Sequence, residues 1–239
     1  LPKKHFDKLV SLYKGNHRLR TFSCWDQYLS MAFAQLTYRE SLRDIEACLR
    51  SNGNKLYHMG IKGNISRTNL SRANETKDYR IYEDLAIKLI SEAKSLYNKN
   101  EMSYKELTNA LYALDSTVID LSLSLFPWAK HRKQKSAVRV NTLLDIRTAL
   151  PAFINISSGG VHEIKSLDLI EIEPLAVYIM DKGFMDFERF NRLNSFNAHF
   201  IIREKKNQAY RRISSFPLPE DENVISDQTI KMTGPKTSI

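Results

Sequence analysis

The chain has 239 residues, and 36 Lys and Arg against 27 Asp and Glu give it a formal net charge of +9. Hydrophobic residues make up 42%, with only 8 Gly and 7 Pro, a composition that excludes collagen-like, linker-like and wholly disordered proteins. No run of about eighteen apolar residues exists, and the start is not a basic segment leading into an apolar one, so neither a membrane span nor an export signal is predicted.

The positive charge lies in the first part of the chain. Residues 1–105 hold 19 Lys and Arg and 11 Asp and Glu, a net charge of +8, whereas residues 106–239 carry +1. Clustered cations bind nucleic-acid phosphates by releasing counterions, although a merely solvated basic surface has the same composition. We therefore predict a basic, DNA-binding domain over residues 1–105 and a second domain over residues 106–239.

The basic domain is predicted to be all helical. Ser23 is placed to cap an amphipathic helix over residues 24–36, and Ser41 to cap a second over residues 42–50, because serine side chains accept hydrogen bonds from the first backbone N–H groups of a helix. A longer amphipathic helix over residues 79–99 is expected to connect the two domains.

A short polar helix is predicted over residues 67–75, beginning after Ser66 and carrying a single apolar position, Leu70. Its long polar side chains can reach base edges or phosphates, and they are Arg67, Asn69 and Arg72. This pattern suits the recognition helix of a helix-turn-helix arrangement, but an ordinary surface helix has it too, so both interpretations stay open.

From residue 107 the pattern changes to strands, and an antiparallel meander is predicted first. The expected elements are, in order, strand 111–121, strand 137–146, strand 151–157, helix 164–170, strand 174–180, helix 187–194 capped by Asp186, and strand 198–203. Three strands followed by helix, strand, helix and strand is the order of an RNase H-like mixed sheet. The predicted fold class is therefore α/β (α+β), with an RNase H-like core preceded by an all-α helical region.

Two aspartates stand out in this core. Asp115 interrupts the first apolar strand, and Asp181 follows the strand over residues 174–180. If these strands are neighbours, the two carboxylates meet at one edge of the sheet, where Mg²⁺ or Mn²⁺ would offset their repulsion. Two such ions can activate a water or a 3′-hydroxyl for in-line phosphoryl transfer. The alternative is a pair of aspartates that only accept hydrogen bonds or form salt bridges.

Cysteine and histidine offer no competing chemistry. Cys24 and Cys48 are too few for a disulfide scaffold and too far apart for a redox pair, so reduced thiols are expected. The six histidines never lie three to five residues apart, so any metal is predicted to be bound by carboxylates.

Cations cluster near both aspartates in the sequence, where a DNA backbone would have to pass. The candidate DNA-binding residues of the second domain are Lys130, Arg132, Lys133, Lys135, Arg139, Arg203 and Lys205. Each could equally be a solvated residue at a hairpin tip or strand end.

Several long segments resemble bacterial insertion-sequence DDE transposases of family four. Residues 113–121 with 125–130 resemble the first catalytic-aspartate block of that family, residues 178–187 resemble the second, and residues 200–205 resemble the strand after it. The first half is similar to the helical accessory domain that precedes this core in one branch of the family, through residues 13–16, 22–27, 36–46 and 56–61. Asn141 and Glu163 depart from the pattern, since relatives tend to show His and Asp there.

The resemblance implies a DNA transposase that cleaves transposon ends and joins the freed 3′-hydroxyl to target DNA. It implies that Asp115 and Asp181 are the first two catalytic, metal-binding acids, with Mg²⁺ or Mn²⁺ as cofactor. It also implies double-stranded DNA as partner, a homodimer on DNA, and a bacterial cytoplasmic, nucleoid-associated location. A metal phosphohydrolase on the same fold is a further alternative, disfavoured by the +8 first half.

The family's third acid is a Glu within a Tyr-x₂-Arg-x₃-Glu-x₆-Lys pattern, and this sequence does not contain that pattern. Residues 210–239 resemble the opening of the β-rich insertion that comes before it. We therefore expect a fragment that starts at Leu1 and stops before the catalytic Glu. An alternative function follows, that of a DNA-binding remnant without catalysis or an inhibitor of the full-length transposase.

Overall fold

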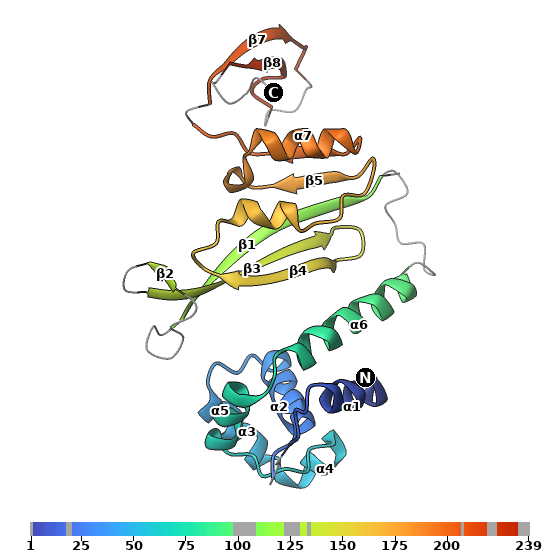
Figure 1. Cartoon of the computed structure of the whole chain (residues 1–239), viewed down its shortest axis with the longest axis vertical. Helices are drawn as coiled ribbons and strands as arrows, with labels where there is room; N and C mark the ends of the chain where they lie inside the picture. Colours follow the sequence, from blue (N-terminus) through green and yellow to red (C-terminus); the bar gives the residue numbers. More distant parts are fainter. Residues whose placement is uncertain are drawn as a thin grey trace. The chain divides into compact units, whose positions relative to one another are not determined.

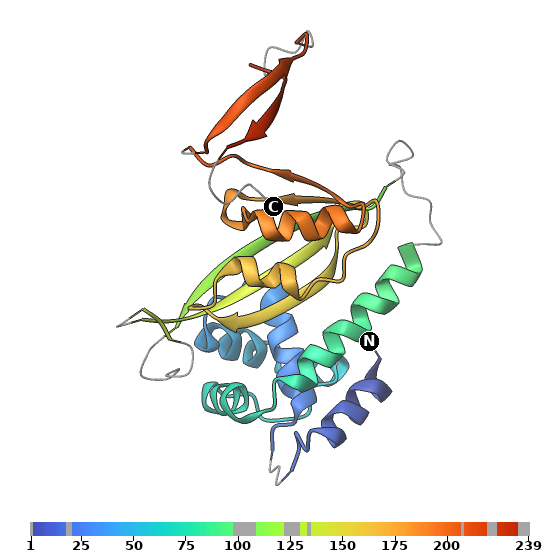
Figure 2. The ribbon, with the colours of Figure 1, turned by 45° about the horizontal axis from the view of Figure 1, so that its top comes forward.

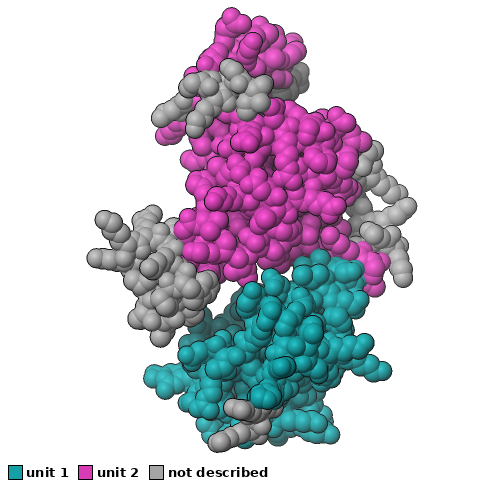
Figure 3. Space-filling view, viewed as in Figure 1, with its two compact units in different colours: residues 1–92 teal, residues 93–239 magenta. Residues whose placement is uncertain are grey.

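The computed structural model describes residues 2–17, 21–97, 109–121, 130–132, 135–206, 208–218 and 224–233, with backbone only at residues 97, 130–132 and 135. It divides into two compact units, residues 1–92 and 93–239 (Figure 3). The functional boundary predicted after residue 105 falls outside the described ranges and stays a prediction.

Unit 1 is helical, as predicted (Figure 1). Its elements are α1 (Lys3–Leu12), α2 (Cys24–Leu36), α3 (Leu42–Ser51), the 3₁₀ turn η1 (Gly53–Lys55), α4 (Leu56–Met59), α5 (Arg67–Thr76) and the start of α6 (Arg80–Tyr97). The predicted N-caps Ser23, Ser41 and Ser66 are confirmed, because each side chain accepts the backbone N–H three residues later. Helices α1 and α4 were not predicted, and neither has a side-chain N-cap.

Two apolar clusters hold unit 1 together. One joins α2, α3 and α5, and its buried members are Phe22, Ala34, Ile45, Leu49, Ile61, Ile65, Leu70 and Ala73. The other joins α1, α2 and α6, with buried members Phe6, Leu9, Val10, Cys24, Ile81 and Leu85. Cys24 and Cys48 are both free thiols, as predicted. Helix α5 therefore contributes only Leu70 and Ala73 to the core and leaves its polar face outside.

Asp26 connects the start of α2 to the loop after α4. It is 5% exposed, and its carboxylate accepts hydrogen bonds from Ser23 N and Oγ at 2.9 and 2.5 Å and from Lys62 N and Gly63 N at 2.8 and 3.1 Å. Burial by itself raises the pKa of Asp26, but these hydrogen bonds outweigh it and hold the pKa below its ordinary value.

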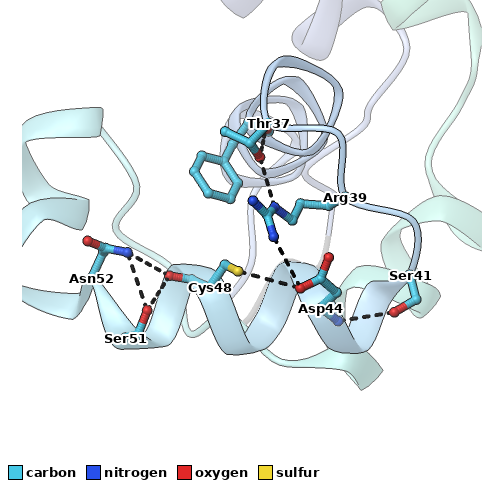
Figure 4. A network of polar contacts seen from close by, with 8 residues as sticks. Thr37, Arg39, Ser41, Asp44, Cys48, Ser51 and Asn52 are labelled. Atoms are coloured by element: carbon cyan, nitrogen blue, oxygen red, sulfur yellow. Dashed lines mark hydrogen bonds and ion pairs between the residues drawn. The ribbon is translucent and has the colours of Figure 1, made fainter.

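The corner between α2 and α3 is held by a polar network around Asp44 (Figure 4). Arg39 Nε donates to Thr37 Oγ1 at 3.3 Å, and Arg39 Nη1 lies 3.6 Å from Asp44 Oδ1. The Cys48 thiol donates to the same carboxylate oxygen at 3.5 Å. These contacts fix where α3 begins after the turn at Tyr38, whose φ is +54°.

Unit 2 contains a mixed sheet with the strand order β2-β3-β1-β5-β6, and β4 pairs with β3 (Figure 1). The strands are β1 (Leu111–Leu121), β2 (Lys130–Arg132), β3 (Lys135–Asp145), β4 (Leu150–Ser158), β5 (Val177–Met180) and β6 (His199–Ile202). β1, β3 and β4 form the predicted antiparallel meander, while β5 and β6 run parallel to β1. This topology confirms the predicted mixed, RNase H-like sheet after a helical region.

Some elements of unit 2 differ from the prediction. The expected helix at 164–170 is a 3₁₀ helix, η2 (Glu163–Asp168), and β5 begins only at Val177 because Leu175 has a φ of +64°. Strand β2 and the separate two-stranded sheet of β7 (Tyr210–Ser215) and β8 (Gln228–Met232) were not predicted as strands. Helix α7 (Phe187–Ser195) begins after Asp186, whose side chain caps it as expected.

One face of the mixed sheet packs against η2 and α7, which lie over it in both views (Figures 1 and 2). Leu114 and Met180 belong to this core, in the same buried cluster as Leu167 of η2 and Leu193 of α7. Side chains alternate along a strand, so the residues next to Leu114 and Met180 face the other way. That second face is open enough to leave Ile156 61% and Ile201 58% exposed. In the ranges given above, no helix has the length and apolar content needed to cross a bilayer.

Candidate functional site

Asp115 and Asp181 lie at the same level of two adjacent parallel strands. In the register of β1 with β5, Leu114 is paired with Met180, so the two aspartates directly follow paired residues, Asp115 within β1 and Asp181 just past the end of β5. Leu114 and Met180 are 3% and 4% exposed, whereas both aspartates are exposed. The strand order therefore confirms that the two strands are neighbours, which is the condition that the sequence prediction set for the two carboxylates to converge.

The turn after β5 sets the position of Asp181. The residue follows the last residue of β5 and precedes the 3₁₀ helix η3 (Lys182–Phe184), whose Phe184 N donates to Asp181 O at 3.0 Å. Phe184 is 2% exposed and packs in the core of unit 2. A buried aromatic side chain thus anchors the turn that places Asp181 at the carboxyl end of β5.

Arg203 extends the row of charged residues to the third parallel strand. Met180 is paired with Ile202 in the register of β5 with β6, so Arg203 follows beside Asp181. Its Nη2 lies 2.8 Å from Asp181 Oδ1, with the two side chains 68% and 51% exposed. Such an exposed ion pair contributes about 0–1 kcal/mol to stability. It therefore offsets the negative charge of Asp181 but does not hold its side chain in one position.

The donor set fits a hard divalent cation in part. Two exposed carboxylates that follow paired residues of adjacent strands offer the hard oxygen ligands that Mg²⁺ and Mn²⁺ prefer. Across the portions of the chain that the structure describes, no group of three or more His, Cys, Asp or Glu side chains is close enough to hold a metal ion. Asp115 and Asp181 therefore fit as two of the ligands of such an ion.

A second polar cluster lies beside this site on the core side of the sheet, and sequence reasoning missed it. Arg139 Nη1 donates to Ser116 Oγ at 2.8 Å and to Glu163 Oε2 at 3.1 Å. Only 13% of the Arg139 side chain and 26% of the Glu163 side chain are exposed. Two signals were available: Glu163 stands where members of the resembled family tend to show Asp, and Gly183, against which its carboxylate lies, belongs to the second family block.

The residues predicted to bind DNA have different surroundings. Arg67 and Arg72 of α5 are exposed, whereas Asn69 Nδ2 donates to Asn64 O at 2.8 Å and so supports the start of its own helix. Arg203 and Lys205 are exposed after β6. The Arg139 guanidinium, in contrast, is directed to Ser116 and Glu163. The side chains of Lys130, Arg132 and Lys135, and all of Lys133, lie outside the described residues.

Comparison with known proteins gives a match for each half of the chain. Residues 106–237 match the family described as "Transposase DDE domain", and residues 1–62 match the family described as "Domain of unknown function (DUF4372)".

Two curated proteins are similar in sequence. "Putative transposase for insertion sequence element IS4SA" from Synechocystis sp. is 25% identical over 214 residues, which is 88% of this chain and 59% of that protein. "Putative transposase y4zB" from Sinorhizobium fredii is 26% identical over 126 residues, which is 51% of this chain and 35% of that protein. The chain thus spans about three fifths or less of the length of these relatives. Among solved structures, the cryo-EM structure of the piggyBac transposase synaptic complex with hairpin DNA has a TM-score of 0.40 and 11% identity, over 77% of this chain and 41% of that one.

Proposed function

The chain belongs to the transposase DDE domain family, and we propose that it supplies the first two metal-binding acids of a transposase that cuts and joins insertion-sequence DNA. The family match confirms the resemblance found in the sequence. The observation that carries the proposed chemistry is the position of Asp115 and Asp181, which directly follow the paired residues Leu114 and Met180 on adjacent parallel strands.

The proposed role of these two carboxylates is to hold Mg²⁺ or Mn²⁺. A pair of such ions, when bound, activates a water or 3′-hydroxyl and stabilises the leaving oxygen of an in-line phosphoryl transfer. Arg203 is bound to Asp181 and therefore limits the charge repulsion between the two aspartates. Both aspartates are exposed, so a phosphodiester of a long polymer can approach them.

The proposed substrate is double-stranded DNA, at transposon ends and at the target. Support comes from the +8 charge of residues 1–105, from the exposed Arg67 and Arg72 on α5, and from Arg203 and Lys205 near the aspartates. We further propose that the protein acts as a homodimer on DNA and is associated with the bacterial nucleoid in the cytoplasm.

The experiment is a cleavage assay with the full chain, Mg²⁺, and DNA fragments that carry the sequences flanking the gene on both sides. Asp115→Asn and Asp181→Asn should abolish strand cleavage while leaving the affinity for the same fragments within about twofold. Asp120→Asn is the matched control, because Asp120 is an exposed acid of the same strand on the other face. Cleavage that survives both site variants would refute the assignment.

A second candidate function is DNA binding without cleavage, as a remnant or an inhibitor of the full-length transposase. One observation favours it: in the part of the chain that the structure describes, no third His, Cys, Asp or Glu side chain joins Asp115 and Asp181 to complete a metal site. This function predicts that the chain binds the end fragments, leaves them intact with Mg²⁺ or Mn²⁺, and reduces cleavage by a full-length relative when the two are mixed.

A further inference from the structure

Glu163, the first residue of η2, contacts Gly183 in the η3 turn that follows Asp181. A Cβ built on Gly183 would overlap Glu163 Oε1 and lie 2.9 Å from its Cδ. Gly183 is not among the glycines with positive φ, so its backbone conformation is one that other residues adopt readily. The reason for glycine at this position is therefore the space taken by the Glu163 carboxylate.

The Glu163 side chain cannot simply move away to make room. Its other oxygen, Oε2, accepts a hydrogen bond from Arg139 Nη1 at 3.1 Å, and the same nitrogen donates to Ser116 Oγ at 2.8 Å. Arg139 is in β3, and Ser116 directly follows Asp115 in β1. Charge-assisted hydrogen bonds between half-buried groups are the stronger kind in proteins, so this link resists displacement.

These contacts connect strand β1 to the η3 turn. They run from Ser116, next to the first aspartate, through Arg139 and Glu163 to Gly183, two residues after the second aspartate. Gly183 is the middle residue of η3, the turn that begins after Asp181. Movement of this turn relative to β1 would change the separation of the two aspartate side chains.

We propose that the Arg139–Glu163 pair is a positioning device that holds the η3 turn, and with it Asp181, in register with Asp115. Glu163 acts through the turn and does not itself bind the metal. The metal part of this inference rests on the proposed function, whereas the effect on the turn does not.

The experiment compares the full-chain variants Glu163→Ala, Glu163→Gln, Gly183→Ala and the double variant Glu163→Ala with Gly183→Ala. The control is Glu171→Ala, which removes an exposed glutamate from the segment between η2 and β5, eight residues after Glu163. Two quantities are measured: Mn²⁺ affinity by electron paramagnetic resonance, and rapid hydrogen exchange of the amides of Phe184 and Met185, which donate to Asp181 O and Lys182 O.

Without metal, Glu163→Ala and Gly183→Ala should each speed exchange of these two amides by roughly tenfold, because the first removes the carboxylate that packs against the turn and the second forces the turn away from that carboxylate. Glu163→Gln keeps an acceptor for Arg139 and should lose much less protection. Because alanine at 183 needs only the space that Glu163 vacates, the double variant should match Glu163→Ala alone rather than the product of both effects. Mn²⁺ affinity should fall in the same order, by about threefold to tenfold, and Glu171→Ala should change neither quantity.

The two readouts separate the possible failures. If exchange of Phe184 and Met185 is unchanged in Glu163→Ala, or rises equally throughout unit 2, the positioning role is wrong. If exchange rises locally but Mn²⁺ affinity is unchanged, Glu163 holds the turn without positioning Asp181, and the inference is overturned. If the wild-type chain binds no Mn²⁺, the proposed function fails, while the exchange data still decide whether the pair holds the turn.

Discussion

Replacing Asp26 by alanine should cost unit 1 a large share of its stability. The side chain is 5% exposed and joins two segments that are 36 residues apart, the start of α2 and the Lys62–Gly63 loop. Its removal leaves the backbone N–H groups of Lys62 and Gly63 without their acceptor and removes the return bond of the capping box to Ser23 N.

The magnitude follows from these bonds. Each lost backbone hydrogen bond in the half-buried loop is worth about 1 kcal/mol, and the loss of half a capping box adds about 1 kcal/mol. The free energy of unfolding of unit 1 should therefore fall by about 3 kcal/mol. Asp26→Asn keeps one oxygen but directs an amide group at donors, so we expect about 2 kcal/mol for that variant.

Protonation of Asp26 at low pH should also lower the stability of unit 1. Because the pKa of Asp26 is held below its ordinary value in the folded chain, its contribution is present above the unfolded-state pKa of about 3.9 and is lost as pH falls through the lower folded-state pKa. Wild-type unit 1 should thus lose stability below about pH 4. Asp26→Ala should lose less over the same range, since this carboxylate is already absent.

The assay is urea unfolding of the full chain followed by Trp25 fluorescence, in a background where Trp128→Phe removes the other tryptophan. Trp25 lies in α2, its ring centroid 5.1 Å from that of Phe6, so its emission reports on unit 1. Asp7→Ala is the matched control, because Asp7 is 56% exposed and forms an ion pair with Lys3 one helical turn away, a surface contact of little energetic weight. A loss for Asp26→Ala no larger than that of Asp7→Ala, within about 0.5 kcal/mol, would refute the reasoning.

Four further predictions test other parts of the molecule. Gly63→Ala should destabilise unit 1 by about 2 kcal/mol in the same fluorescence assay, because the new Cβ would lie 2.6 Å from Thr21 O and 2.8 Å from Asp26 Oδ2. The first of these is a backbone atom and the second is held by hydrogen bonds, so neither moves away at low cost. A neutral result would mean that the loop shifts at little cost. Tyr178→Phe should lower the free energy of unfolding of unit 2 by about 1 kcal/mol, because the buried hydroxyl accepts a hydrogen bond from Glu173 N at 3.0 Å. The melting temperature of unit 2 should fall accordingly, and calorimetry that shows no change would contradict this prediction. Asp115→Asn and Asp181→Asn should each weaken Mn²⁺ binding by at least about tenfold in titrations while leaving the melting temperature within about 2 °C, because both side chains are exposed; unchanged Mn²⁺ affinity would remove the proposed metal site. Arg67→Ala and Arg72→Ala should each lower DNA affinity and reduce the salt dependence of binding by about one unit of slope, the amount expected per phosphate contact, whereas an unaltered slope would exclude α5 from the DNA interface.

The elements that could be predicted from the sequence are those encoded over a few neighbouring residues. Ser23, Ser41, Ser66 and Asp186 each cap a helix through a bond to the residue three positions on, so the signal and its effect lie in the same segment. The strand order was also predictable, because an antiparallel meander followed by alternating helices and strands has few compact arrangements.

The position of the two aspartates was predictable for the same reason. Asp115 lies within one strand and Asp181 directly after another, and parallel neighbours of that order bring the two to one level. The resemblance to a transposase family pointed to the same two residues, and the match over residues 106–237 confirms the family. Their roles in catalysis stay a prediction that the cleavage assay tests.

Only the tertiary structure decided the contacts between distant segments. Nothing near Asp26 in the sequence indicates that it will accept the N–H groups of Lys62 and Gly63, and nothing near Glu163 indicates that its carboxylate will lie against Gly183. Periodicity reports which face of an element is buried, but the partner of a buried polar group depends on how whole elements pack. Local hydrogen bonds and residue spacing therefore determined the elements and their order. The packing of whole elements determined which distant residues hold the Lys62–Gly63 loop and the η3 turn in place.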